Sequence, residues 1–249
     1  IRVVNEENID SEHICCAITE TKGEHCAKSK KGWMKKRFDQ GLVFRKLNVR
    51  GKVFIEYIPA EYAFAPVEAA NYMYINCFWV SGKYKGKGHA NALLDACIEE
   101  SKSLGKKGVV ILSSKKKKPF LSDPSYLKHK GFLVCDQAKP YFELLYLPFN
   151  KDGESPRFMA CVSETIETEQ DFVLYYSNQC PHTEKYVALI KGLAVENGFS
   201  FETRKIETVE AAKKSATPFT TYSLYVKGGF HTNEILSEKK FVKLMDSLL

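Results

Sequence analysis

The stretch VSGKYKGKGHANALLDACIEESKSLG, residues 80–105, places a loop rich in glycine and lysine directly before a helical pattern. Apolar and small side chains then recur every three or four residues, which predicts a helix with one face on a sheet. The members of this face are Ala90, Leu93, Leu94, Cys97, Ile98 and Ser101. Gly105 predicts the end of the helix.

The loop itself predicts an anion site. The first N–H groups of a helix have no partner within the helix, so they bind phosphate oxygens. Glycine at 86 and 88 would let a diphosphate approach these amides, and Lys83, Lys85 and Lys87 add positive charge. The spacing matches neither the nucleotide P-loop nor the dinucleotide GxGxxG pattern.

The flanking segments predict an α/β sheet. Runs rich in β-branched and aromatic residues predict strands at 42–49, 51–58 and 72–80, the first two joined as an antiparallel hairpin by a turn at 48–51. Further strands are expected at 108–114, 132–136 and 141–149, with a short helix at 122–131 that Gly131 closes.

Residues 150–170 lose this periodicity, so we place a linker there between a first domain, 1–149, and a second, 171–249. In the second domain, strands are expected at 172–177 and 199–206 and a hairpin at 220–232. Helices are expected at 181–197, 208–216 and 237–249, which gives the order βαβαββα.

The hexapeptide Lys85-Gly86-Lys87-Gly88-His89-Ala90 resembles motif A of the GNAT acetyltransferases, with lysine in place of the usual arginine or glutamine. FWV at 78–80 and YLKHKGF at 126–132 are similar to the strand end and the closing helix of that family. The resemblance covers roughly residues 1–149. It implies the GNAT acyl-CoA N-acyltransferase fold, a mixed sheet flanked by helices, with acetyl-CoA bound by Phe78, Trp79, Val80 and residues 85–90.

The resemblance also implies acetyl transfer to a primary amine by direct attack, with the amide near Val80 as donor to the carbonyl and Cys77 left to packing. The family's acid, a tyrosine, would fall on Leu127, so the neighbouring Tyr126 is either a shifted acid or a core residue. Glu56 or Glu61 could act as base, or both could be surface carboxylates.

Two further segments each allow two interpretations, one as part of a binding site and one as ordinary structure. The run SSKKKK at 113–118 could reach the adenosine 3′-phosphate or an acidic acceptor, or be an exposed loop. Six aromatic residues between Phe54 and Tyr74 could line an acceptor pocket or only pack in the sheet.

The segment SNQCPHTEKY, residues 177–186, puts Cys180 after a strand and at a helix start, where a thiolate is favoured. With Thr183 in place of a second cysteine, it resembles the thioredoxin fold in a CPxT version. The resemblance implies a cis Thr217–Pro218 bond, with Pro218 facing the thiol. Both halves together are similar to acetyltransferases with a C-terminal YoaP-like domain.

The second domain could position the substrate or serve only as a scaffold. An alternative function is a monothiol redox or sensing protein that acts through Cys180, with Cys161 as a resolving thiol and a first domain that binds CoA.

Composition narrows the classes of ligand and the cellular location that we expect for the protein. A net charge of +7 suits a phosphate-bearing small molecule as well as nucleic acid, and without a reading motif nucleic acid ranks last. No apolar run is long enough to span a bilayer, and eight irregularly spaced cysteines favour reduced thiols, so we expect a cytoplasmic protein.

We expect no metal at a group of His13, Cys15, Cys16, His25 and Cys26. The expected partner is a small-molecule or peptide amine; the oligomeric state is open.

Overall fold

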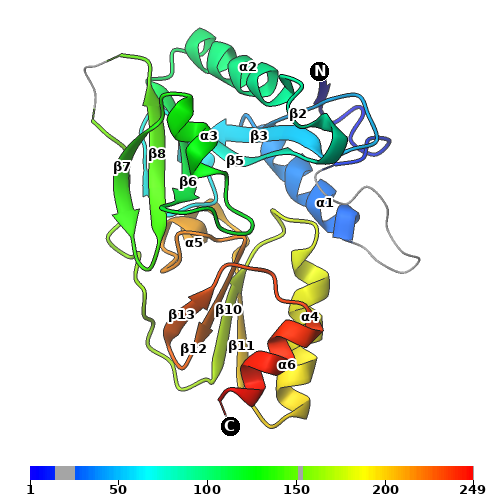
Figure 1. Cartoon of the computed structure of the whole chain (residues 1–249), viewed down its shortest axis with the longest axis vertical. Helices are drawn as coiled ribbons and strands as arrows, with labels where there is room; N and C mark the ends of the chain where they lie inside the picture. Colours follow the sequence, from blue (N-terminus) through cyan, green and yellow to red (C-terminus); the bar gives the residue numbers. More distant parts are fainter. Residues whose placement is uncertain (15–25, 151–153, 249) are drawn as a thin grey trace.

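The computed structural model describes residues 1–14, 26–150 and 154–248, which form two units, one above the other in Figure 1. The upper unit contains a seven-stranded sheet in the order β1-β2-β3-β5-β6-β8-β7. Its strands are β1 (Arg2–Val4), β2 (Val43–Lys46), β3 (Val53–Pro59), β5 (Met73–Val80), β6 (Gly108–Ser114), β7 (Leu133–Ala138) and β8 (Phe142–Pro148). Its helices are α1 (Cys26–Phe38), α2 (His89–Ser103) and α3 (Pro124–His129), with 3-10 turns η1 (Ala60–Tyr62) and η2 (Gly82–Tyr84).

Helices cover both faces of this sheet. Leu93 and Leu94 of α2 and Leu127 of α3 pack against one face, together with Val53 and Ile55 of β3. On the opposite face, α1 packs against Phe44, Phe54 and Ile58 through Trp33 and Met34. Six of the seven residues of β3 are buried, because neither of its faces meets water. The helix and strands expected from 42–58, 72–80, 90–105 and 108–149 are confirmed.

The centre of the sheet opens at β5 and β6. These strands run parallel, but they pair only from Met73↔Val109 to Ile75↔Ile111. Immediately beyond, the pairing of β3 with β5 shifts, because Glu56 faces Cys77 while Tyr57 faces Ile75. Asn76 is therefore the extra residue of a β-bulge, which bends β5 away from β6.

The lower unit has a four-stranded sheet in the order β11-β10-β12-β13. β10 runs parallel to β11 and antiparallel to β12. α4 and α6 pack on one face through Val187, Ile190, Phe241 and Met245. The elements are β10 (Phe172–Tyr176), α4 (Thr183–Glu196), β11 (Phe201–Lys205), α5 (Val209–Lys213), β12 (Tyr222–Val226), β13 (Gly229–Thr232) and α6 (Glu238–Asp246). The expected order βαβαββα is confirmed.

The two units share one core. Ile206 and Ala212 of the lower unit are buried in the same apolar cluster as Trp33, Phe54 and Phe64 of the upper one. The expected linker is also structured, since β9 (Arg157–Phe158) pairs with β4 (Val67–Glu68) and Thr165 bridges to Gly229. The lower unit is thus packed against the face of the sheet that α1 covers.

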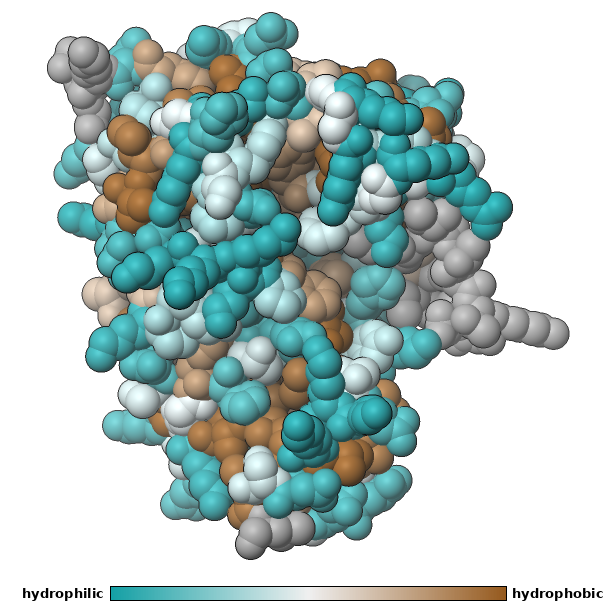
Figure 2. Space-filling model, viewed as in Figure 1, coloured by the Kyte–Doolittle hydropathy of each residue, from teal (hydrophilic) through white to brown (hydrophobic). Residues whose placement is uncertain are grey.

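Hydrophilic side chains cover much of the surface drawn in Figure 2, with apolar atoms visible between them in both units. Among the residues that the structure describes, no helix is both long and apolar enough to cross a membrane.

Candidate functional site

The glycine-lysine loop leads from β5 into α2 through two left-handed residues. Gly86 has a φ of 72° and Gly88, the residue before the helix, a φ of 77°. L side chains rarely adopt this conformation, which explains why both positions are glycine. The N–H groups of Gly86, Lys87 and Gly88 make no hydrogen bond to any described residue, whereas that of Lys85 donates to the Gly82 carbonyl at 3.2 Å. The turn η2 therefore uses the amide of Lys85, which is not open to an anion.

The edge of β5 that faces β6 supplies further donors. The Ser81 N–H donates to the Lys52 carbonyl, next to β3, at 3.0 Å. N–H groups alternate between the two edges of a strand, so those of Phe78 and Val80 face the other edge. On that side the pairing with β6 has already ended at Ile75.

The loop and this edge line one cavity of about 820 Å³. Phe78, Trp79, Val80, Lys85, Gly86, Gly88, His89 and Ala90 all line it, as does Tyr126. Of the expected coenzyme-contacting residues, Lys87 is not part of the lining. Tyr84 and Asn91, which the sequence did not single out, also contribute to the wall.

The opposite wall is the segment after β6. The Ser113 hydroxyl donates to the Ser122 carbonyl at 2.8 Å, which ties the two ends of this segment together. Lys117 and Lys118 line the cavity, and Lys117 pairs with Asp123 at 3.0 Å. The interpretation of 113–118 as an exposed loop therefore holds for Lys115, Lys116 and Lys117, whereas Lys118 is half-buried and Ser113 and Ser114 are buried.

Phe120 belongs to the same segment and was missed from the sequence. Its φ of 63° is rare for a bulky residue, and the residue is 43% exposed. It lines both this cavity and a smaller neighbouring one. Strained backbone of this kind tends to be kept at functional sites.

Tyr126 lies between the loop and β5. Its hydroxyl donates to Asn91 Oδ1 at 3.1 Å, and its ring lies against Phe78 with centroids 5.7 Å apart. Burial, with Asp95 nearby, raises the pKa of Tyr126 to about 12. The phenol is therefore protonated near neutral pH and able to donate a proton. Leu127, the position that the family pattern would give to tyrosine, is fully buried.

Neither glutamate considered as base lies exposed in this cavity. Glu56 is fully buried and accepts from Lys30 Nζ at 2.5 Å and from Asn76 Nδ2 at 3.1 Å. It is not the surface carboxylate that its charge suggested. Glu61 accepts from the Asn71 N–H at 2.7 Å and lines a different cavity.

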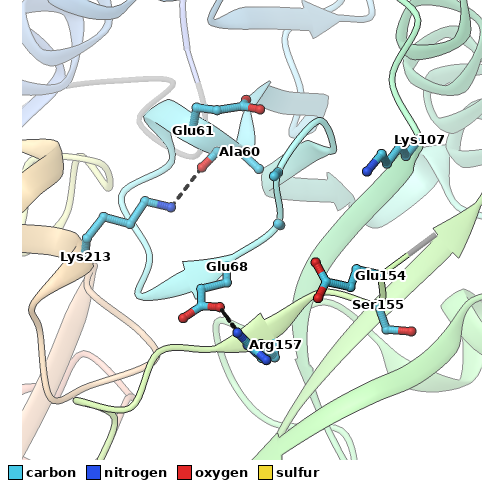
Figure 3. A pocket seen from close by; sticks show the side chains of 10 residues that line it. Ala60, Glu61, Glu68, Lys107, Glu154, Ser155, Arg157 and Lys213 are labelled. Atoms are coloured by element: carbon cyan, nitrogen blue, oxygen red, sulfur yellow. Dashed lines mark hydrogen bonds and ion pairs between the residues drawn. The ribbon is translucent and has the colours of Figure 1, made fainter.

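That cavity, about 360 Å³, lies at the junction of the two units and is shown in Figure 3. Charged side chains of this cavity bind other parts of the chain. Arg157 Nε donates to Glu68 at 2.6 Å, and Lys213 Nζ donates to the carbonyls of Ala60 and Val67, each at 2.9 Å. Burial lowers the pKa of Lys213. Positive and negative side chains alternate around the wall, so it lacks the cationic, amide-lined character of the larger cavity.

The lower unit places the candidate thiol at its edge facing the upper one. Cys180 is half-buried against the core of this unit, and Thr183 Oγ1 donates to the Cys180 carbonyl at 2.6 Å. The Thr217–Pro218 bond is not cis; the cis bond in the described residues joins Lys139 to Pro140. In place of a cis turn, the Phe219 N–H donates to Thr217 Oγ1 at 3.2 Å, closing a turn with a trans proline.

Of the other cysteines considered from the sequence, Cys77 packs against the main core. Cys161 is exposed, and its Sγ donates to the Lys213 and Ser215 carbonyls. Of the N-terminal group, His13 Nδ1 lies 3.1 Å from Lys46 Nζ, whereas Cys15, Cys16, His25 and the side chain of Cys26 are outside the described residues.

A split sheet beside a helix whose first amides are open defines a class, the acyltransferases with the GNAT fold. Family models agree: residues 12–118 match the acetyltransferase (GNAT) family and residues 201–243 a YoaP-like family. The chain is 42% identical over 245 residues, 98% of both chains, to the uncharacterized N-acetyltransferase YoaP of Bacillus subtilis (strain 168). The chain belongs to the GNAT N-acetyltransferases with a YoaP-like C-terminal part, and acetyl-CoA is the cofactor of this class.

Solved structures are similar at a lower level. Escherichia coli YhbS in complex with CoA is 14% identical, covers 63% of this chain and 87% of its own, and has a TM-score of 0.39. Ard1 from Thermoplasma volcanium is 12% identical over 60% of this chain and 97% of its own, with a TM-score of 0.40. The family match and the 42% identical relative do not favour the monothiol alternative.

Proposed function

We propose that this chain transfers the acetyl group of acetyl-CoA to a primary amine by direct attack. The observation that carries the proposal is the 820 Å³ cavity, in which the open amides of Gly86 and Gly88 lie at one end and the open edge of β5 leads away from them. Amides and lysines at a helix start favour a diphosphate, and an open strand edge favours the amide groups of a pantetheine arm.

The side chains present fit the coenzyme. Lys85, Lys117 and Lys118 give the walls positive charge, while Phe78, Trp79 and Phe120 supply apolar surface. Asp123, the carboxylate of the lining, is neutralised by Lys117 and caps α3 by accepting from the Ser125 N–H. A cationic end joined to an apolar channel matches a diphosphate followed by an acyl thioester.

When bound, acetyl-CoA supplies the acetyl thioester. The N–H of Phe78 or Val80 is the donor that would stabilise negative charge on the carbonyl oxygen. In the transfer a nitrogen–carbon bond forms, the carbon–sulfur bond breaks, and the nitrogen releases one proton to water. Tyr126 gives its proton to the leaving sulfur and regains one from water.

The test has two independent readouts on the full chain. Calorimetry with acetyl-CoA measures coenzyme binding, and CoA release with a panel of primary amines, with mass spectrometry of the product, measures transfer. We expect binding without an amine and an amide product with one. Absence of acetyl-CoA binding would refute the proposal.

A further inference from the structure

A separate cavity, of about 220 Å³, lies between α1 and the lower unit and shares no wall residue with the proposed coenzyme cavity. At about 30 Å³ for each water molecule, it has room for about seven of them, which is enough for an anion of the size of phosphate. One face of α1 forms one side of this cavity, because the wall residues recur every three or four positions. They are Ser29, Gly32, Trp33, Lys36 and Arg37.

The described part of the wall carries more positive than negative charge. Its cations are Lys36, Arg37 and Lys205, and its carboxylate is that of Glu207, so three positive charges against one negative charge leave a net charge of +2. Lys205 Nζ lies 3.7 Å from Glu207 Oε1. Lys36 and Arg37 form no ion pair with any residue that the structure describes, so two cations face this cavity without a counter-charge.

Arg37 is the buried member of this group, with 7% of its surface exposed. Its Nη1 and Nη2 donate to the carbonyls of Lys36 and Glu207, at 3.1 and 3.2 Å, and its guanidinium lies 4.5 Å from the ring centroid of Phe64. Burial lowers the pKa of Arg37, and Glu210, which is outside the wall, offsets only part of this effect. A buried charge without a counter-ion is costly, and an anion in the cavity would supply one.

Gly32 is a second observation that points to a ligand. It lies inside α1, where glycine weakens a helix relative to alanine. A Cβ at this position would meet no described atom within 4 Å outside its own helix, so the packing of the protein does not require a glycine. The glycine is explained if a ligand approaches the helix on this face.

We propose that this cavity binds a small, doubly charged anion of the phosphate type, either free or as a monoester. The ammonium groups of Lys36 and Lys205 hold the anion from the two units, and Arg37 adds its buried charge. A phosphate monoester carries about 1.5 to 2 negative charges at pH 7, which matches the net charge of the wall. The bound anion joins α1 to the lower unit, and this site is independent of the proposed transfer reaction.

The test is calorimetry of the full chain with inorganic phosphate, at constant ionic strength and with saturating CoA to occupy the proposed coenzyme loop. We expect one phosphate to bind to each chain, and acetate, which has a single charge, to bind at least tenfold more weakly. Glycerol 3-phosphate represents a monoester. Tighter binding than that of phosphate would identify a monoester as the ligand, and weaker binding would identify the free anion. Absence of saturable binding for both would overturn the inference.

Three lysine variants and one glutamate variant test the wall. Lys36→Met and Lys205→Met should each raise the Kd of phosphate at least tenfold, because each removes a positive charge. The matched control is Lys35→Met, which should change the Kd less than twofold because Lys35 is outside the wall and pairs with Asp10 at 2.8 Å. Glu207→Gln removes the carboxylate of the wall and should lower the Kd at least twofold. Equal Kd values for the wild type, Lys36→Met and Lys205→Met would overturn the inference.

Gly32→Glu places a carboxylate in the cavity and should abolish phosphate binding without lowering the midpoint of thermal unfolding, which separates this loss from misfolding. Unchanged phosphate affinity in this variant would also contradict the site. Failure of the wild type to bind CoA would remove the proposed function alone. Phosphate titrations without CoA, compared between the wild type and Lys205→Met, would then still decide whether this site exists.

Discussion

Glu56 lies wholly inside the upper unit, between Lys30 of α1 and Asn76 of β5. A buried charge is retained only with partners, and removing one partner of such a pair costs about 3–5 kcal/mol. Substitution of Glu56 would therefore lower activity through folding, even without contact with substrate. Sequence alone could not separate this role from catalysis, because Lys30 is distant along the chain.

Gly88 offers the sharpest single-residue test of the anion loop. Gly88→Asp places a carboxylate at the proposed diphosphate position, and like charges about 4 Å apart repel by roughly 4 kcal/mol near a protein surface. We expect the Kd of acetyl-CoA to rise at least tenfold. Calorimetry against Gly88→Asn separates charge from conformation, since both side chains meet the same left-handed backbone. Equal affinities for the two variants would tell against a diphosphate there.

Tyr126→Phe tests the proposed acid. The variant keeps the ring against Phe78 and removes only the hydroxyl, so acetyl-CoA affinity should stay within about threefold. Turnover should fall at least tenfold, because the leaving sulfur loses its proton donor. Unchanged kcat in steady-state CoA release would make Tyr126 a packing residue.

Among the elements, β6 carries a tight contact at its first residue. A Cβ at Gly108 would lie 2.4 Å from the Leu147 carbonyl oxygen and 2.8 Å from the Tyr72 ring. Gly108→Ala should therefore lower the free energy of unfolding by about 1–3 kcal/mol. In the same unit, Gly32 of α1 has open space, so Gly32→Ala should raise it by about 0.5–1 kcal/mol. Denaturant unfolding of both variants gives the comparison; changes of the same sign would contradict this packing.

The periodicity of apolar residues in the sequence was sufficient to predict the long helices and strands. The face of α2 that the spacing predicts is the buried one, and the strands around it were found because β-branched and aromatic residues are concentrated there. α1 was not predicted, since CAKSKKGWMKKRF is dominated by lysine and hides its apolar contacts in Trp33 and Met34. β4 and β9 have two residues each, too few for any repeat.

The residues of the candidate site also divide into those that a local sequence pattern predicted and those that were missed. Residues 78–80 and 85–90 were predicted to act together because they are close in the sequence and follow a local pattern, and all of them except Lys87 line one cavity. Phe120 was missed, since a left-handed backbone at a bulky residue has no local signature. The cis bond at Pro218 was wrong for a similar reason, because the hydroxyl of Thr217 builds the turn instead.

For the whole molecule, buried tyrosines set the behaviour at high pH. Burial raises the pKa values of Tyr57, Tyr74 and Tyr222 above the ordinary 10.0, so the folded state retains protons that the unfolded state releases. The stability that this contributes is complete below about pH 10 and is lost as pH rises further. Denaturant unfolding between about pH 8 and pH 11, with tyrosinate absorbance as a second probe, should show a steady decline above pH 10. Constant stability over that range would contradict the burial of these rings.

The two units are packed together through a shared apolar core. Because Ile206 and Ala212 complete the apolar cluster of the upper unit, and Gln179 and Pro218 line the smaller cavity beside the coenzyme cavity, the C-terminal unit lies next to the proposed active site. Its strand order and directions are consistent with a thioredoxin-like unit. We interpret it as a unit packed against the acetyltransferase unit rather than a separate redox module.

A crystal structure of the full chain with CoA tests the central claim most directly. The account predicts diphosphate oxygens within about 3.2 Å of the main-chain nitrogens of Gly86 and Gly88, and the sulfur near Phe78 and Tyr126. CoA bound at the junction cavity of Lys107, Arg157 and Lys213, with the amides of 86–88 closed by protein atoms, would contradict it.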